Sequence, residues 1–188
     1  MKKAIFLDRD GTINEDVGYF CSMEKFRLIP KALDALKSLQ KYFDLFIVTN
    51  QSGVARKIFS EADLISFNGE IEKFLFEKGI SIKKTYYCPH LPEDLCHCHK
   101  PSPYFLKETS KEYDIDLKQS FVIGDHPHDV EMAGAVGAKS AYVLTGHGEK
   151  HRDELKIQPD YLAADIFQAT NWIQSVRVLG RGCRVRAG

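Results

Sequence analysis

Short apolar runs alternate along the chain with longer segments in which apolar residues recur at helical spacing. The runs predict β-strands, the longer segments predict helices, and the alternation is typical of parallel sheets built from strand–helix–strand units. We therefore expect an α/β fold around one five-stranded parallel sheet. Its strands are predicted near Ala4–Leu7, Leu45–Val48, Thr85–Tyr87, Phe121–Ile123 and Ser140–Val143.

Proline, serine and glycine mark the ends of the periodic segments. Pro30 suits the start of a helix with apolar residues at positions 32, 33, 36 and 39, and Ser60 suits the N-cap of a second helix that ends before Gly79. Three further helices are predicted at Tyr104–Tyr113, at Asp129–Val136, which Gly137 closes, and at Ile166–Val176, packed on the outside.

Length and charge limit the kind of protein. The chain has 188 residues, 44% of them hydrophobic, which suits one globular domain over residues 1–176. Lys plus Arg and Asp plus Glu number 26 each, so net charge favours neither nucleic acid nor an anionic membrane as a partner. No apolar run suits a signal peptide or a membrane span. We expect a cytoplasmic monomer that holds anions with a local cluster.

The C-terminal segment differs in composition from the rest. Residues 177–188 contain four arginines, no acid and no clear period. We expect a flexible basic tail there, and the alternative is an arm that binds nucleic acid.

Two carboxylates follow the first apolar run directly. Asp8 and Asp10 are two positions apart, so in a strand both point to one side while Arg9 faces away. Such a pair suits Mg²⁺, which commonly bridges protein oxygens to a substrate phosphate, and Gly11 allows a sharp turn beside a ligand. The same residue types also form ordinary surface turns, so the position of the motif must decide between the two.

Polar groups follow other predicted strands as well. Thr49–Ser52 follow the second strand, Asp125 follows the fourth, Asp129 lies four residues later at a helix start, and Lys100 offers a compact positive charge. Taken singly, these groups have ordinary structural explanations: residues 49–52 could form a capped turn, Asp129 could cap a helix, and Lys100 could be solvated. Because the carboxyl ends of parallel strands meet at one edge of a sheet, we expect them together in one crevice that binds phosphate and a divalent cation.

A cysteine-rich loop forms the second candidate site. Three cysteines and His90 lie within eleven residues in the pattern Cys88-x-His90-x5-Cys96-x-Cys98, with His97 and His99 as neighbouring competitors. Four such ligands suit a closed, structural zinc site that pins the loop 88–103. The absence of a C-x-x-C motif argues against a redox role, and an intracellular chain argues against disulfides. Cys21 and Cys183 are expected to be unpaired thiols.

The motifs together resemble a known superfamily. Asp8-x-Asp10-Gly11-Thr12, Thr49, Lys100 and Gly124-Asp125-x3-Asp129 are similar to the four motifs of the haloacid dehalogenase (HAD) superfamily of phosphotransferases, over about residues 4–145. The segments 49–56 and 87–90 resemble the D-glycero-D-manno-heptose 1,7-bisphosphate phosphatase family. The related histidinol-phosphatase branch has a similar cysteine loop but typically an acid in place of Ser52. The resemblance implies a HAD-like, Rossmannoid three-layer fold, and the short inter-motif segments predict no large cap domain.

The resemblance also implies catalytic roles. Asp8 would be the nucleophile that becomes an aspartyl-phosphate, and Asp10 the general acid and then base. Thr49 and Lys100 would stabilise charge on the transferring phosphoryl group. The implied Mg²⁺ ligands are Asp8, the Asp10 backbone carbonyl and Asp125, with Asp129 ordering the surrounding shell, and the implied Zn²⁺ ligands are Cys88, His90, Cys96 and Cys98.

Substrate contacts follow from the same resemblance. The implied substrate-facing residues are Asp16, Val17, Gly18, Tyr19, Asn50, Gln51, Ser52, His99 and His126. The last two stand where the family usually has Arg and Lys, so we expect affinity for a bisphosphate to improve as pH falls from about 8 toward 6. The implied reaction removes the C7 phosphate of the heptose bisphosphate in lipopolysaccharide precursor synthesis. The alternatives are a histidinol-phosphate phosphatase and a non-catalytic, zinc-bearing binding module.

Overall fold

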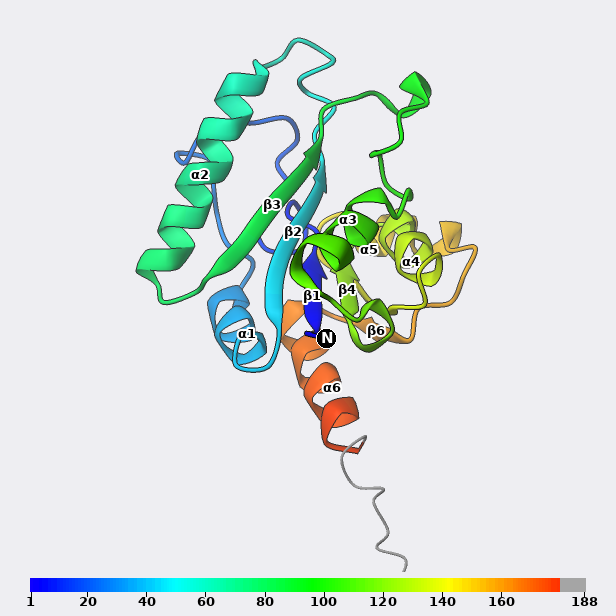
Figure 1. The fold of residues 1–188 in the computed structure, drawn as a ribbon. Helices are drawn as coiled ribbons and strands as arrows, with labels where there is room; N and C mark the ends of the chain where they lie inside the picture. Colours follow the sequence, from blue (N-terminus) through cyan, green and yellow to red (C-terminus); the bar gives the residue numbers. More distant parts are fainter. Residues whose placement is uncertain (180–188) are drawn as a thin grey trace, which may run out of the picture.

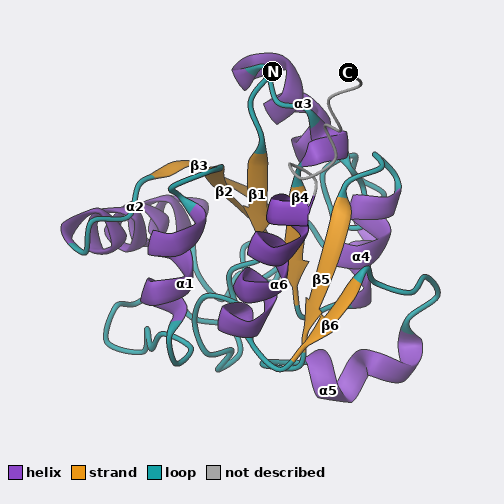
Figure 2. Ribbon diagram, turned by 90° about the horizontal axis from the view of Figure 1, so that it is seen from below, coloured by secondary structure: helices purple, strands orange, loops and turns teal. Residues whose placement is uncertain are grey.

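The core of the fold is a parallel sheet. A computed structural model describes residues 1–179, and within them six parallel strands lie in the order β3-β2-β1-β4-β5-β6 (Figure 2). The sixth strand was not predicted, so the count of five is wrong: β6 is only three residues long and lies at the edge of the sheet. The strands are β1 (Ala4–Leu7), β2 (Asp44–Asn50), β3 (Ile82–Cys88), β4 (Phe121–Gly124), β5 (Lys139–Val143) and β6 (Tyr161–Ala163).

Helices cover both faces of this sheet, which gives the three layers that were expected (Figure 1). One face packs against α1 (Ala32–Leu39), α2 (Glu61–Glu77) and α6 (Ile166–Leu179). The other packs against α3 (Tyr104–Tyr113) and α4 (Pro127–Gly134). A short helix, α5 (Gly148–His151), follows β5, and single turns of 3₁₀ helix lie at Pro92–Asp94, Leu117–Gln119 and Arg152–Glu154.

The central strand shows why the sheet is buried on both sides. Along β1, Ile5 and Leu7 pack into one apolar cluster while Ala4 and Phe6 pack into the other. All four side chains are fully buried. Continuous apolar runs of this kind are characteristic of parallel strands covered by helices on both faces.

The helix boundaries agree with the expectations in part. Ser60 caps α2 in a reciprocal capping box with Asp63, and α3 has the predicted bounds. The start of α4 was predicted two residues too late, because Pro127 occupies the first turn, where a proline is tolerated. The predicted start of the tail at residue 177 is also wrong, since α6 runs to Leu179. The rest of the predicted tail, 180–188, with its nucleic-acid alternative and Cys183, lies outside the described residues.

The carboxyl ends of the strands position the candidate site. Strand β1 pairs in parallel with both β2 and β4, so the loops that follow these three strands emerge side by side at one edge of the sheet. Within the described part of the chain, no helix has both the length and the apolar composition needed to cross a membrane.

Candidate active site

Three buried carboxylates converge around Lys100 at this edge. Asp8 follows β1, Asp125 follows β4, and Asp129 lies in the first turn of α4. Each offers an oxygen, and these oxygens all lie within 4.8 Å of one another. The Lys100 ammonium donates to Asp8 Oδ1 at 2.6 Å and to Asp129 Oδ1 at 2.7 Å. The predicted convergence of Asp8, Asp125, Asp129 and Lys100 is therefore present in the fold.

The electrostatics of this cluster favour an additional cation. Burial raises the pKa of the Asp8 carboxyl to about 7, even though the Lys100 ammonium opposes the shift. Burial and then the Asp8 charge raise the pKa of the Asp125 carboxyl to about 9. Although burial alone would lower it, Asp129 and Asp8 raise the pKa of Lys100 above its usual value. One ammonium among three buried carboxylates leaves an excess of oxygen donors, which is the donor set that Mg²⁺ prefers.

Two glycines and a loop hold Asp125 in place. The His147 backbone N–H donates to Asp125 Oδ2 at 2.7 Å, and Thr145 Oγ1 donates to the Gly11 carbonyl at 2.6 Å. Gly11 and Gly146 have φ of 84° and 56°, and they pack against the Asp125 carboxylate. A Cβ on either glycine would lie under 3.0 Å from Asp125 Oδ2. The β5–α5 loop and the turn after β1 thus enclose this carboxylate.

Five hydrogen bonds from three side chains hold the two oxygens of Asp10, because Arg9 Nε donates to both of them. Arg9 donates through Nε at 3.2 Å and Nη2 at 2.7 Å, Asn14 Nδ2 donates at 2.9 Å, and Gln51 Nε2 donates at 2.7 Å. Burial by itself would raise the pKa of the Asp10 carboxyl, but Arg9, Asn14 and Gln51 together hold it below its usual value. Asp10 is therefore ionised in the free protein and lines the same cavity as Asp8.

The residues after β2 connect the parts of the site. Thr49 is buried, and its Oγ1 accepts from Gln51 Nε2 at 2.9 Å. Gln51, expected on the sugar side, is mostly used to orient Asp10 and Thr49, and little of it is exposed. Asn50 Oδ1 accepts from the Lys100 backbone N–H at 3.0 Å. Asn50 therefore fastens the segment that carries Lys100 to the end of β2.

A cavity of about 460 Å³ opens beside these groups. Of the expected substrate loop, Asp16, Gly18 and Tyr19 line this cavity, whereas Val17 does not and is 52% exposed. Tyr19 Oη lies 3.3 Å from Ser52 Oγ. The other expected substrate residues that line it are Asn50, Gln51, Ser52, His99 and His126.

Sequence reasoning missed two histidines of the cavity wall, His128 and His147. The His126 ring centroid lies 4.4 Å from that of His128 and 5.1 Å from that of His151. Burial lowers the pKa of His126 to about 4 and also lowers the pKa of His99. Burial therefore opposes the expected gain of positive charge between pH 8 and 6 at both residues, and it keeps the His126 ring neutral over that range. His147 could have been predicted as a cavity residue only from its position in the loop after β5.

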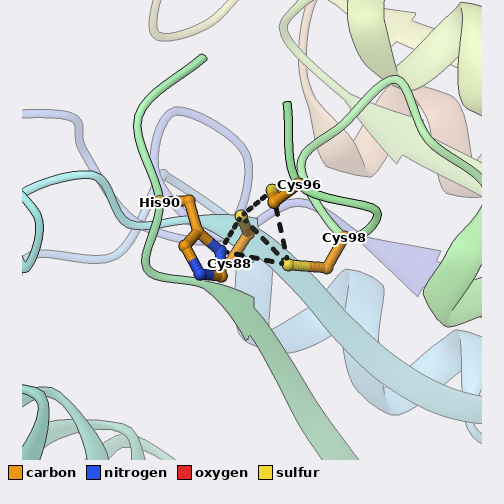
Figure 3. A group of neighbouring side chains, drawn as sticks. All are labelled: Cys88, His90, Cys96 and Cys98. Carbon is orange, nitrogen blue, oxygen red and sulfur yellow. Dashed lines mark hydrogen bonds between the residues drawn. The ribbon is translucent and has the colours of Figure 1, made fainter. Parts of the chain in front are cut away.

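The cysteine loop forms a compact ligand cluster at the end of β3 (Figure 3). The Sγ atoms of Cys88, Cys96 and Cys98 lie 3.3–3.7 Å apart, and His90 Nδ1 lies 3.4–3.6 Å from Cys98 and Cys88. Tetrahedral zinc with bonds of about 2.0–2.3 Å requires ligand separations of about 3.6–3.8 Å, so the cluster fits this ion. The sulfurs are too far apart for a disulfide.

The cluster lies two residues from Lys100 in the chain. Cys98 is buried, and Lys100 follows it in the chain. Burial raises the pKa of the Cys88 and Cys98 thiols, so these thiolates need a cation to form. Cys21, by contrast, is a half-buried free thiol.

Comparisons with known proteins agree with this geometry. The fold and the four motifs define a HAD-like hydrolase, and residues 97–169 match the HAD-hydrolase-like family model. The chain is 36% identical to D-glycero-beta-D-manno-heptose-1,7-bisphosphate 7-phosphatase of Pasteurella multocida (strain Pm70), over 94% of this chain and 100% of that protein. A relative from Chlorobaculum tepidum, D-glycero-D-manno-heptose-1,7-bisphosphate 7-phosphatase, is also 36% identical, over 89% of this chain and 92% of its own length.

A solved structure is similar over the whole fold. D,D-heptose 1,7-bisphosphate phosphatase from B. bronchiseptica, complexed with magnesium and phosphate, superposes with a TM-score of 0.84 at 29% identity, covering 93% of this chain and 99% of that chain. The chain belongs to the D-glycero-D-manno-heptose-1,7-bisphosphate 7-phosphatase family.

Proposed function

We propose that this protein is a Mg²⁺-dependent phosphatase that removes the C7 phosphate of D-glycero-D-manno-heptose 1,7-bisphosphate, a step in the synthesis of lipopolysaccharide precursors. The observation that carries the proposal is the meeting of Asp8, Asp10, Lys100 and Asp125 beside one cavity. Relatives named for this reaction, at 36% identity over nearly the whole chain, support the choice of substrate. The catalytic unit is proposed to be a monomer.

The chemistry proceeds in two half-reactions. An Asp8 oxygen attacks phosphorus, the bond from phosphorus to the sugar oxygen breaks, and Asp10 gives that oxygen a proton. A water then attacks the aspartyl-phosphate, Asp10 takes the water proton, and inorganic phosphate and free Asp8 are formed. Asp10 is ionised in the free protein, which suits the second half-reaction. The dianionic phosphate supplies the nearby negative charge that raises its pKa for the first.

Other groups stabilise charge on the phosphoryl oxygens. Lys100 is a fully buried cation beside Asp8, and Thr49 presents a buried hydroxyl at the end of β2. The residues proposed to hold Mg²⁺ are Asp8, the Asp10 backbone carbonyl and Asp125, with Asp129 oriented beside them. When bound, the ion supplies positive charge next to the carboxylates and the phosphate. A structural Zn²⁺ held by Cys88, His90, Cys96 and Cys98 is proposed to fix the loop that carries Lys100.

A phosphate-release panel tests the proposal. It contains both anomers of the heptose bisphosphate, histidinol phosphate and fructose bisphosphate, each with and without Mg²⁺. We expect Mg²⁺-dependent release from the heptose bisphosphate, loss of it in Asp8→Asn, and wild-type rates in the matched control Asp34→Asn, an exposed carboxylate on α1. Preference for histidinol phosphate, or no hydrolysis of any ester, would reject the proposed function.

A further inference from the structure

Arg9 is a fully buried cation outside the reaction mechanism. Its side chain is 1% exposed and lies over the Phe67 ring, with Cζ 5.2 Å from the ring centroid. Arg9 lies just after the end of β1, and its guanidinium contacts both Asp10 and helix α2. A guanidinium is costly to bury without hydrogen-bond partners, so its contacts indicate what it does.

Arg9 connects Asp10 to helix α2. Its Nε and Nη2 donate to the Asp10 carboxylate, and its Nη1 donates to Asn68 Oδ1 at 2.8 Å. Asn68 lies in the middle of α2 and is 6% exposed. It is the polar member of the buried stripe of this helix, which otherwise consists of Leu64, Phe67, Ile71 and Leu75.

Asparagine is a poor residue for this place by helix propensity and by burial. It competes with the helix backbone for hydrogen bonds, and a leucine there would continue the apolar stripe. The contact with Arg9 gives its carbonyl a partner that no neighbour on the stripe offers. The guanidinium is thereby held from both sides, by Asp10 and by Asn68.

The other donors to Asp10 lie on different segments. Asn14 Nδ2 comes from the turn after β1, and Gln51 Nε2 comes from the loop after β2. Arg9 and Asn68 are therefore the route by which the packing of α2 acts on the orientation of the Asp10 carboxylate. Proton transfer requires that orientation to be correct to within a fraction of an ångström.

We propose that Arg9, braced by Asn68, is a positioning residue that aims the Asp10 carboxylate at the reacting oxygen. This inference rests on the proposed function, in which Asp10 transfers the proton. Because Asp10 acts in the transition state, loss of the brace lowers kcat, while the substrate contacts that set KM stay in place.

A double-mutant cycle tests whether Asn68 acts through Asp10. For Asn68→Ala we expect kcat to fall about 10- to 100-fold with KM within about twofold of wild type. In an Asp10→Asn background the same change should alter kcat by less than about twofold, because the group being aimed is gone. Asn68→Asp keeps an acceptor for Arg9 Nη1, so we expect this variant to retain most of the wild-type kcat.

Thr170→Ala is the matched control. Thr170 is also a buried polar residue on a helix, and its Oγ1 donates to the Ile166 carbonyl of the same helix, α6. We expect normal kcat and KM. An equal loss of kcat in the wild-type and Asp10→Asn backgrounds, or a loss confined to KM, would overturn the positioning role.

Two measurements separate this inference from the proposed function. If the wild-type protein does not hydrolyse heptose bisphosphate, the proposed function fails, and the same cycle is measured with p-nitrophenyl phosphate. A crystal structure of Asn68→Ala needs no substrate: we expect the Asp10 carboxylate to turn away from Gln51. A carboxylate that keeps its hydrogen bonds to Asn14 and Gln51 unchanged would overturn the inference.

Discussion

Replacing Gly146 by alanine should weaken magnesium binding, because the added methyl group would displace the Asp125 carboxylate. The new Cβ would lie under 3.0 Å from both Asp125 Oδ2 and the Gly11 Cα. Gly146 also has φ of 56°, a left-handed conformation that costs other residues about 1–2 kcal/mol. The shifts needed to relieve the overlap cost about 1–3 kcal/mol more. Together the two costs should lower the free energy of unfolding by about 2–5 kcal/mol.

The magnesium dependence of the rate is the decisive assay. Disturbance of groups that orient a metal ligand typically costs about 10- to 100-fold in metal affinity, and we expect such a rise in the Mg²⁺ concentration for half-maximal activity. Gly79→Ala is the control, since Gly79 also has positive φ, 78°, but has no atom within 4 Å of the added Cβ. It should lose only about 1–2 kcal/mol and keep wild-type Mg²⁺ dependence. Equal Mg²⁺ dependence of the two variants would refute the reasoning.

Three further outcomes are expected. Lys100→Met removes the ammonium that Asp8 and Asp129 share, and we expect kcat to fall by about 10²–10³-fold while circular dichroism shows an intact fold; near-normal kcat would contradict this. Cys98→Ser should lose bound zinc by elemental analysis and lose kcat by a similar factor, and adding Lys100→Met should then change little; a zinc-free variant at full rate would exclude a link between the sites. His126 has its pKa lowered to about 4, so below pH 6.5 the unfolded chain binds a proton that the folded protein does not. Stability in urea should therefore decline from pH 6.5 toward 4, and less so in His126→Gln; the same slope in both proteins would count against this assignment.

The arrangement of the candidate site was predictable because it follows from sheet geometry. Asp8 and Asp125 each come directly after a buried apolar strand, and β1 and β4 pair in parallel with Leu7 opposite Ile123. Such pairing brings the residues after the two strands together regardless of the intervening sequence. The cysteine cluster was predictable for a different reason, since the spacing of Cys88, Cys96 and Cys98 is local and needs no knowledge of the fold. The choice of His90 over its histidine neighbours came from the family resemblance.

What could not be predicted depends on contacts between distant segments. Asn68 is simply a polar residue in a helical pattern until α2 is packed against the turn after β1. Gln51 was expected to face the sugar, but its amide donates to Asp10, which lies in the turn after another strand, β1. Strand β6 is too short for a periodicity, and it is recognisable only from its pairing with β5, Tyr142 opposite Leu162. Burial likewise set the pKa of His126, and burial is a tertiary property.

One residue of the β5–α5 loop belongs to two parts of the site at once. The backbone N–H of His147 donates to Asp125, and its ring Nε2 lies 3.0 Å from Oδ2 of Asp16, in the loop that is expected to face the substrate. A ligand that shifts Asp16 should therefore also shift His147, whose backbone N–H holds the Asp125 carboxylate in place. Discrimination between related sugars should consequently appear in turnover as well as in affinity, so that a poorly fitting sugar can bind well and still react slowly.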